Sequence, residues 1–387
     1  MENYARGLAE RLAGFGHSVS VFYPLLDEDG ETGLLVEELG GVRAAGFRGG
    51  SRNFFEHLSE PRTEAAFADF ISRGGFDVIH FQHTYHGLPF SLISLAAARS
   101  ALVCLTLHDF WHICPLAHLI TADGNICGGE VAADACAVCL AKELGLEESA
   151  APRLSGFAAR RRAAASEALA AASVVTAPSS YVLGAHARRF SLNGKAAVSP
   201  LGMAPVAEVP RRPANGRIRF TFMGRINRLK NLRAALDAMA GVSGPAELNV
   251  WGARADAREA QRLERAVKRD SRIRYRGAYD GANLPDVLSE TDVGIVPSLT
   301  ESFSLVAREY HAAGIPVLAA RAGALPEAVG KGGILFDPYD AGELSGIMQA
   351  IVNDPGLIEK LSGGIRPVKS MEEDARQWER VYTENPA

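Results

Sequence analysis

Short apolar runs alternate with amphipathic helical patterns along most of the chain. In the first half, apolar runs predict strands at 17–23, 77–81, 101–107, 173–177 and 196–199, and helical spacing predicts helices at 89–98, 153–172 and 180–189. Parallel strands need a crossover connection between them, usually a helix. The alternation therefore predicts βαβ units and an α/β fold.

The alternation falls into two blocks. Between Gly202 and Gly216 the text GMAPVAEVPRRPANG carries prolines and glycines without periodicity, which is typical of a linker. The pattern then restarts, with strands expected at 218–223, 247–251, 273–275, 292–297 and 316–319 and helices at 231–240, 256–269, 284–289, 304–313 and 343–353. We expect two doubly wound, Rossmann-like domains facing a cleft, 1–203 and 204–370, and a C-terminal helix within 371–387 that packs back on the first domain.

The first domain opens on a helix rather than a strand. Tyr4, Leu8 and Leu12 have helical spacing, and the first apolar run follows only at 17–23. An α/β domain usually begins with a strand near the centre of its sheet. We interpret this pattern as a missing first strand, through a misassigned start or a truncated chain, in preference to a fold that begins with a helix.

Composition narrows the class of protein. The chain is 47% hydrophobic and 22% charged, as a soluble globular protein is, and its net charge of −4 does not favour nucleic acid as a partner. We found no apolar run of the ~18–20 residues that a membrane span needs, and no secretion signal at the start. We therefore expect a cytoplasmic enzyme, with peripheral contact at the inner face of the membrane left open.

The segment FMGRINRLKN carries a candidate phosphate site. A strand ends at Gly224, where a ligand can approach the backbone closely, and Arg225 and Lys230 lie either side of a short loop before the next helix. A guanidinium and an ammonium at a helix start suit a diphosphate and neutralise the charge of a departing nucleoside diphosphate. The alternative is two solvated surface charges, and this segment alone does not decide between them.

The segment PSLTESFSLVARE adds two carboxylates. Glu301 lies just before a helix expected to start near Ser304, and Glu309 lies one to two turns inside it. Carboxylates accept hydrogen bonds from sugar hydroxyls, and unpaired N–H groups at Phe303, Ser304 and Leu305 suit phosphate oxygens. An ordinary amphipathic helix with an acidic first turn is the alternative.

Four segments together resemble a known family. GRINRLKN, PSLTESFSLVARE, HAAGIPVLAARAGALPEAVG and GGILFDPYD are similar, in this order, to signatures of retaining family-4-type glycosyltransferases with the GT-B fold. The resemblance implies that Arg225 and Lys230 hold the donor diphosphate, Glu301 the transferred sugar and Glu309 the nucleotide ribose. It implies a phosphate cradle of amides from Ser302 to Leu305. Many members carry glycines where this chain has Ser302 and Ser304.

Histidines follow two strands of the first domain. His108 ends the strand in ALVCLTLHDFW, and it is similar to the family histidine that faces the donor sugar from the acceptor domain. A half-buried histidine bonded to the backbone is the alternative. His80, His83 and His86 follow another strand, where we expect them to line an acceptor pocket. Their spacing matches no standard metal site.

Four cysteines form an insertion in the first domain, Cys114, Cys127, Cys136 and Cys139, the last two as CxxC. In a chain without a secretion signal this pattern favours structural zinc over free thiols, and free thiols over disulfides. Cys104 lies inside a strand, where we expect a buried apolar role. Arg160, Arg161 and Arg162 begin the Ala-rich helix, and we expect them on a solvated face rather than against anionic lipid.

These observations predict a glycosyltransferase. It would move a sugar from a nucleoside-diphosphate sugar to a hydroxyl of a glycan, glycolipid or small molecule, with retention implied by the resemblance and no cofactor needed for catalysis. Cell-surface polysaccharide or glycolipid synthesis is the expected setting. The alternative is a nucleotide-binding remnant or regulatory partner without transfer, motivated by the missing strand. A phosphorylase with the same fold is disfavoured, because no lysine stands in an evident aldimine context.

Overall fold

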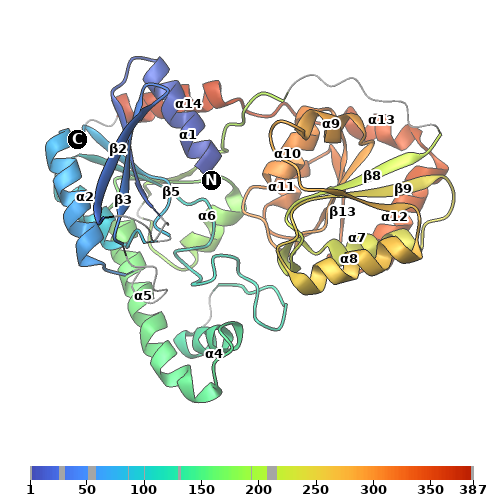
Figure 1. Cartoon of the computed structure of the whole chain (residues 1–387), viewed down its shortest axis with the longest axis horizontal. Helices are drawn as coiled ribbons and strands as arrows, with labels where there is room; N and C mark the ends of the chain where they lie inside the picture. Colours follow the sequence, from blue (N-terminus) through green and yellow to red (C-terminus); the bar gives the residue numbers. More distant parts are fainter. Residues whose placement is uncertain are drawn as a thin grey trace. The chain divides into compact units, whose positions relative to one another are not determined.

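A computed structural model describes residues 2–25, 31–50, 58–85, 87–99, 101–129, 132–192, 194–206 and 216–384 (Figure 1). The chain divides into two compact units, of which unit 1 comprises 1–204 and 369–387 and unit 2 comprises 205–368. Most of the expected linker, at 207–215, lies outside the described residues. Within the described part of the chain, no helix is long and apolar enough to cross a membrane.

Unit 2 alternates strands and helices throughout. Its elements are β8 (Ile218–Met223), η3 (Arg228–Lys230), α7 (Leu232–Ala240), β9 (Ala246–Trp251), α8 (Ala257–Arg269), β10 (Ile273–Gly277), α9 (Leu284–Ser289), β11 (Val293–Val296), α10 (Leu305–Ala312), β12 (Val317–Ala320), α11 (Leu325–Val329), β13 (Gly333–Phe336), α12 (Ala341–Asn353) and α13 (Gly356–Ser362).

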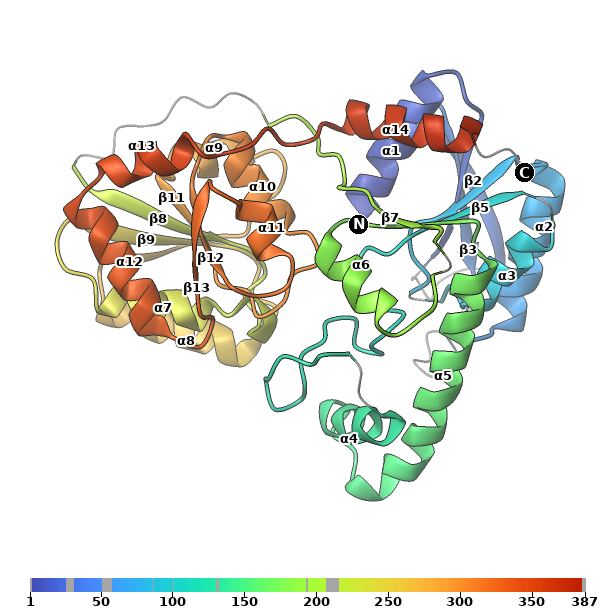
Figure 2. The same cartoon turned by 180° about the vertical axis from the view of Figure 1, so that it is seen from behind.

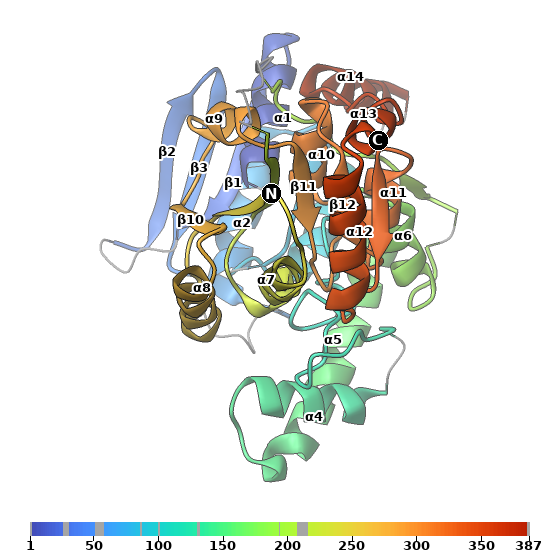
Figure 3. The same ribbon diagram turned by 90° about the vertical axis from the view of Figure 1, so that its right-hand side faces the viewer.

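The strands of unit 2 form one parallel sheet in the order β10-β9-β8-β11-β12-β13. Residues of β8, β9, β11 and β12 are almost all buried, as expected for a parallel sheet covered by helices on both faces (Figure 3). Three of the described α-helices of this unit, α8, α10 and α12, start at a polar side-chain cap; Asp256, for example, caps α8 by accepting from two backbone N–H groups. Because all strands run in one direction, their carboxyl ends share one edge.

Unit 1 contains the rest of the chain. Its elements are α1 (Glu2–Gly14), β1 (Val19–Pro24), β2 (Gly33–Leu39), β3 (Val42–Arg48), α2 (Pro61–Gly74), β4 (Val78–Phe81), α3 (Ser91–Ala97), β5 (Leu102–Thr106), α4 (Ala133–Glu143), η2 (Glu148–Ala150), α5 (Ala151–Ala171), β6 (Val174–Ala177), α6 (Ser180–Ala187), β7 (Ala196–Val198) and α14 (Met371–Glu384).

The strands of unit 1 form two sheets, β1-β3-β2 and β4-β5-β6-β7. Phe22 of β1 and Phe81 of β4 both pack against Phe67 of α2, with ring centroids 5.3 and 5.9 Å apart, so one helix covers both sheets. No strand pairing joins the sheets within the described ranges. β1, an edge strand of the first sheet, is partly exposed along its whole length, whereas β5 of the second sheet is fully buried. The rest of unit 1 therefore covers β1 less completely than β5.

Helix α14 belongs to unit 1 and lies beside α1 (Figure 2). The Tyr4 hydroxyl donates to the Asp374 carboxylate at 2.8 Å, and the Gly202 N–H donates to the same oxygen at 2.8 Å. Asp374 is fully buried, so these bonds compensate for removing its charge from water. The indole of Trp378 packs on the ring of His80, with centroids 4.1 Å apart, which ties α14 to β4.

Several elements of unit 1 were not expected from the sequence, among them α2, the β2–β3 hairpin and α4. β2 and β3 pair antiparallel through a turn at Gly40 and Gly41, both with positive φ, a Gly-Gly hairpin signal that was overlooked. Helix α4 contains the CxxC pair and packs on α5 through a small core with Leu140, Leu154 and Phe157. Together α4 and α5 form an arm that extends beyond the sheets of unit 1 (Figures 1 and 3).

Candidate active site

The loop after β8 is held in close contact with the loop after β9. Gly224 has φ 148° and Gly252 has φ 153°, and a Cβ atom on Gly252 would lie 1.8 Å from the Gly224 carbonyl oxygen. A side chain is therefore excluded at 252. Arg225, directly after Gly224, is exposed and forms no ion pair with a residue in the described ranges. The guanidinium is thus available at the carboxyl edge of the sheet.

Lys230 and Glu301 are brought together by the fold. The Lys230 Nζ donates to Glu301 Oε1 at 2.6 Å, although 71 residues separate them in sequence. Lys230 is held by η3, where its backbone N–H donates to Asn227 Oδ1 at 3.0 Å. Asn231, with φ 50°, fixes the next turn by donating to the carbonyls of Pro297 and Pro338. Two of the predicted ligand-binding groups therefore pair with each other.

Glu301 is fixed through its backbone. Its carbonyl oxygen accepts from the Ala324 N–H at 2.8 Å, and Gly323 approaches so closely that a Cβ there would lie 2.3 Å from that oxygen. The side chain of Glu301 is only 11% exposed. Because Oε1 of Glu301 is paired with Lys230, Oε2 is the oxygen that can accept a hydrogen bond from a sugar hydroxyl.

Ser304 adopts a left-handed backbone conformation, with φ 58° and ψ 79°, at the N-cap of α10. A residue with a Cβ pays roughly 1–2 kcal/mol for this conformation. Glycine, which many members of the resembled family carry at this position, avoids this cost. The Ser304 hydroxyl accepts from the Ala307 N–H at 3.4 Å, so the side chain is directed into the helix start.

Glu309 lies inside α10 with one carboxylate oxygen, Oε2, buried and without a hydrogen-bond partner among the described residues. Burial raises the pKa of Glu309. A buried acceptor without a hydrogen-bond partner lowers the stability of the fold. The presence of one here therefore favours a ligand that donates a hydrogen bond to Glu309. A ribose hydroxyl, as implied by the resemblance, has the required chemistry.

Two residues in this region were missed in the sequence. Tyr279, in the loop after β10, has its pKa raised by burial and by the charges of Glu309 and Glu301. The guanidinium of Arg308 lies 3.8 Å from the centre of the Phe303 ring and holds the loop before α10. The position of Tyr279 directly after a parallel strand could have indicated it.

Two histidines of unit 1, His80 and His108, are hydrogen-bonded inside the fold. His108 Nε2 bonds to Gln82 Oε1 at 2.8 Å and its ring packs edge-on against Tyr4. Burial, and then the neighbouring charges, lower the pKa of His108 to about 3, so the ring is neutral near pH 7. His80 bonds to the hydroxyls of Tyr382 and Thr106. His86 lies outside the described residues.

The structure does not support the predicted zinc site at Cys114, Cys127, Cys136 and Cys139. All four thiols are free, and no group of three or more His, Cys, Asp and Glu side chains in the described part of the chain is arranged to hold a metal ion. Cys136 and Cys139 lie within α4, where Cβ atoms three positions apart are about 5–6 Å from each other. Cys114 and Cys127 instead pack partly against the core of unit 1.

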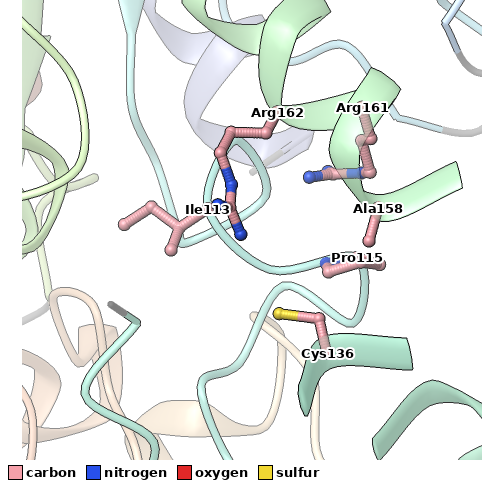
Figure 4. A pocket seen from close by; sticks show the side chains of 6 residues that line it. All are labelled: Ile113, Pro115, Cys136, Ala158, Arg161 and Arg162. Atoms are coloured by element: carbon pink, nitrogen blue, oxygen red, sulfur yellow. The ribbon is translucent and has the colours of Figure 1, made fainter. Parts of the chain in front are cut away.

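Arg161 corrects a second expectation. Its side chain is buried rather than solvated: it lies over the Trp111 ring at 4.4 Å and the Phe90 ring at 5.2 Å, and it donates to the carbonyls of Trp111 and His112. Together with Arg162 and Cys136 it lines a small cavity at the base of the arm (Figure 4). Arg161 therefore joins the arm to the loop after β5, and it does so by stacking on aromatic rings, a role that lysine would not replace.

Two family models match the chain. The model described as Glycosyltransferase Family 4 matches residues 1–205, and the model described as Glycosyl transferases group 1 matches residues 217–354. The chain belongs to glycosyltransferase family 4. The resemblance inferred from the four sequence segments is thus confirmed.

Curated relatives match shorter stretches. A D-inositol 3-phosphate glycosyltransferase from Arthrobacter sp. (strain FB24) is 30% identical over 149 residues, covering 36% of this chain and 35% of the relative. The MMP alpha-(1->4)-mannosyltransferase of Mycolicibacterium hassiacum is 41% identical over 81 residues, 20% of each chain. The matched stretches span about a third or less of these relatives' lengths.

Solved structures match nearly the whole chain. Sucrose-phosphate synthase from Thermosynechococcus elongatus has a TM-score of 0.73 at 22% identity, covering 98% of this chain and 92% of the other. Anabaena HepE in complex with UDP and glucose has a TM-score of 0.60 at 16% identity, covering 89% and 87%. At these identities the likeness establishes the fold, and the predicted GT-B architecture of two Rossmann-like domains is confirmed.

Proposed function

We propose that the protein transfers a sugar from a nucleoside-diphosphate sugar to a hydroxyl group, with retention at the anomeric carbon. The observation that carries this proposal is the ion pair of Lys230 with Glu301; it is joined by Glu309 of α10, the helix that follows Glu301, whose Oε2 is buried without a hydrogen-bond partner among the described residues. A cation, a carboxylate and a buried carboxylate oxygen without a partner suit a diphosphate, a sugar and a ribose in turn. Membership of family 4 supports the same reaction class.

In the proposed reaction the bond between the anomeric carbon and the diphosphate oxygen breaks, and the acceptor oxygen bonds to the same face of that carbon. The acceptor proton passes to the departing phosphate. Arg225 and Lys230 would neutralise the developing diphosphate charge, and the Lys230–Glu301 ion pair would open so that each group binds the donor. Catalysis would rest on charge neutralisation and positioning.

Donor and setting follow from the relatives as proposals. HepE is solved with UDP and glucose, which makes a UDP-hexose the first donor to examine. A D-inositol 3-phosphate glycosyltransferase and a lipopolysaccharide outer core galactosyltransferase are among the matches, so polyols and cell-surface glycans are acceptor classes to examine. We propose a role in cell-surface polysaccharide or glycolipid synthesis on this basis.

A nucleotide-binding protein without transfer activity is the second candidate. The described strands of unit 1 form two sheets that no strand pairing joins. This arrangement favours the second candidate, because a divided acceptor side would bind an acceptor more weakly while unit 2 stays intact.

The test combines binding with turnover. UDP-, GDP-, dTDP- and ADP-sugars are screened for thermal stabilisation of the wild type, Arg225→Ala and Glu309→Ala, and nucleoside diphosphate release is measured with and without polyol acceptors. We expect one nucleotide class to stabilise the wild type and not the variants. Binding without any release would favour the second candidate. Stabilisation by no nucleotide sugar, or an unchanged response in both variants, would contradict the donor site.

A further inference from the structure

The histidines that follow β4 differ in how far their ring nitrogens are used within the fold. Both nitrogens of His80 are bonded, Nδ1 to the Tyr382 hydroxyl at 2.7 Å and Nε2 to Thr106 Oγ1 at 2.8 Å. His83 uses only one: Nε2 lies 3.0 Å from Asp109 Oδ2. His83 Nδ1 is buried and has no hydrogen-bond partner among the described residues. His83 is therefore the ring with a nitrogen left for a ligand.

Asp109 decides what kind of ligand that nitrogen can take. The Asp109 carboxylate is held by the Trp111 N–H, which donates to Oδ1 at 2.8 Å. Burial raises the pKa of Asp109, but the hydrogen bonds that its carboxylate accepts from His83 and from the Trp111 N–H outweigh burial, so the pKa is lowered and Asp109 is ionised near pH 7. An ionised carboxylate only accepts, so His83 Nε2 carries the proton. In the neutral ring Nδ1 is then an acceptor, and its partner must be a donor such as a hydroxyl.

The place of His83 suits a substrate of unit 1. His83 follows β4 and Asp109 follows β5, and these parallel neighbours end at the same edge of the sheet. The half-buried Tyr85 ring lies edge-on to His83, with centroids 5.9 Å apart. Thr84, which is fully buried, leaves its hydroxyl without a partner in the same segment. Polar atoms without partners beside an aromatic ring suit a polyhydroxylated molecule better than a metal ion or an anion.

We propose that His83, held by Asp109, accepts a hydrogen bond from a hydroxyl of the acceptor, which is a sugar or cyclic polyol. This rests on the proposed function and extends it by naming the acceptor class and the group that binds it. Asp109 is a positioning residue in this proposal, since it acts through His83. The Lys230 and Glu301 side chains, in unit 2, belong to donor binding and are independent of it.

The test uses two variants that separate the ring nitrogens. In His83→Gln the side-chain amide can keep the donor to Asp109 but provides no acceptor at the position of Nδ1. In His83→Asn an amide oxygen can take the position of Nδ1 while the bond to Asp109 is lost. His80→Gln is the matched control, because both His80 nitrogens are bonded inside the fold.

The first measurement is the long-range ¹H–¹⁵N spectrum of the histidine rings, with His83 assigned by its loss in His83→Gln. We expect Nε2 to carry the proton and the Nδ1 resonance to shift when myo-inositol or methyl α-D-mannopyranoside is added with UDP. A proton on Nδ1, or an Nδ1 resonance that neither probe moves, would overturn the proposal without bearing on donor binding.

The second measurement is steady-state transfer to the same two probes and to D-inositol 3-phosphate at saturating donor. Loss of one hydrogen bond to the acceptor should raise the acceptor KM of His83→Gln roughly tenfold, with the donor KM unchanged, and His83→Asn should recover part of the loss. Equal acceptor KM values in wild type and His83→Gln would overturn the proposal. Absence of any nucleoside diphosphate release by the wild type would instead contradict the proposed function, and the spectrum would still decide the role of His83.

Discussion

The two units differ in the polar side chains that follow their strands. In unit 2 an ion pair and an exposed guanidinium lie near the sheet edge, and Glu309 Oε2 is buried without a hydrogen-bond partner among the described residues. In unit 1 His80 is bonded to Tyr382 and His108 to Gln82, whereas His83 Nδ1, His112 Nε2 and His186 Nε2 are buried without such a partner among the described residues. Groups bonded inside the fold stabilise it, whereas groups without partners cost stability and are available to ligands.

The sheets differ as well. The sheet of unit 2 is continuous across the described residues, and its central strands are buried. The described strands of unit 1 form two sheets, and the unit buries His108, His112 and His186, whose pKa values are lowered by burial. We infer that unit 2 carries donor chemistry on a rigid support and that unit 1 is the less robust unit. The predictions below test this difference.

The largest expected effect is a loss of unit 1 stability in mild acid. Burial lowers the pKa of His108 to about 3 and that of His186 to about 4, so the folded state resists protonation that the unfolded chain accepts near pH 6.5. Unfolded chains then bind more protons, and stability falls as pH drops below about 6.5 and continues to fall toward pH 3–4. Between pH 7 and 5 each histidine should remove about 2 kcal/mol.

Amide hydrogen exchange, corrected for intrinsic rates, measures this effect strand by strand. Protection of β5 in unit 1 should fall by orders of magnitude between pH 7 and 5, while protection of β8 should change much less, because His311 is the sole histidine of unit 2. Equal losses in both strands would show that the units unfold together.

The next effect concerns donor cations. Replacing Lys230 or Arg225 by alanine should lower kcat/KM for the donor by roughly 10²–10³, because each neutralises charge that develops on the leaving diphosphate. Thermal unfolding should change little in Arg225→Ala, since Arg225 is exposed. Lys230→Ala should also lower the melting temperature, because it leaves the mostly buried Glu301 carboxylate without its cation. Arg233→Ala is the matched control: Arg233 pairs with Asp237 on the surface of α7. A comparable loss in that variant would indicate a general charge effect.

Glu309 should show opposite effects on stability and binding. In Glu309→Gln a buried acidic group with an unpartnered oxygen becomes neutral, so the ligand-free protein should melt at the same or a slightly higher temperature. Donor KM should rise about tenfold, because a charged acceptor is replaced by a neutral one. The two values are read from a melting curve and from donor kinetics. A variant with normal donor KM would remove Glu309 from the site.

The smallest expected effect is at Ser304. Because its φ is 58°, Ser304→Gly should relieve the backbone cost while losing the weak cap to Ala307, a net change within about 1 kcal/mol. Ser304→Val, with a branched Cβ, should destabilise the protein by about 1–2 kcal/mol more. Denaturant unfolding of both variants measures the difference. Equal stabilities would mean that the loop relaxes out of the left-handed conformation.

Regular alternation was sufficient to predict most of the fold. The strands and helices from β8 to α10 lie within two residues of the expected bounds, because each strand is an apolar run and each helix has an apolar face. The hairpin of β2 and β3 was missed, since β2 carries Glu37 and Glu38 and exposes Leu35, Val36 and Leu39. Helix α4 was missed because its cysteines were interpreted as metal ligands.

The candidate donor site could be proposed from its residues but not from its contacts. Arg225, Lys230, Glu301 and Glu309 were expected from residue types after strand ends and in the helix that follows, which is a local property. That Lys230 and Glu301 pair with each other depends on strands brought together by the sheet order.

What the sequence determined by itself is therefore the class of fold and the family, together with a set of candidate donor-binding residues, since these follow from periodicity and from short ordered motifs. Only the tertiary structure decided which side chains keep a polar atom without a hydrogen-bond partner among the described residues. Nothing in the spacing of His80 and His83 separates them, yet Tyr382 from the far end of the chain bonds to the first and Asp109 leaves one nitrogen of the second without a partner. Partners distant in sequence determine this, because a hydrogen bond depends on positions in space.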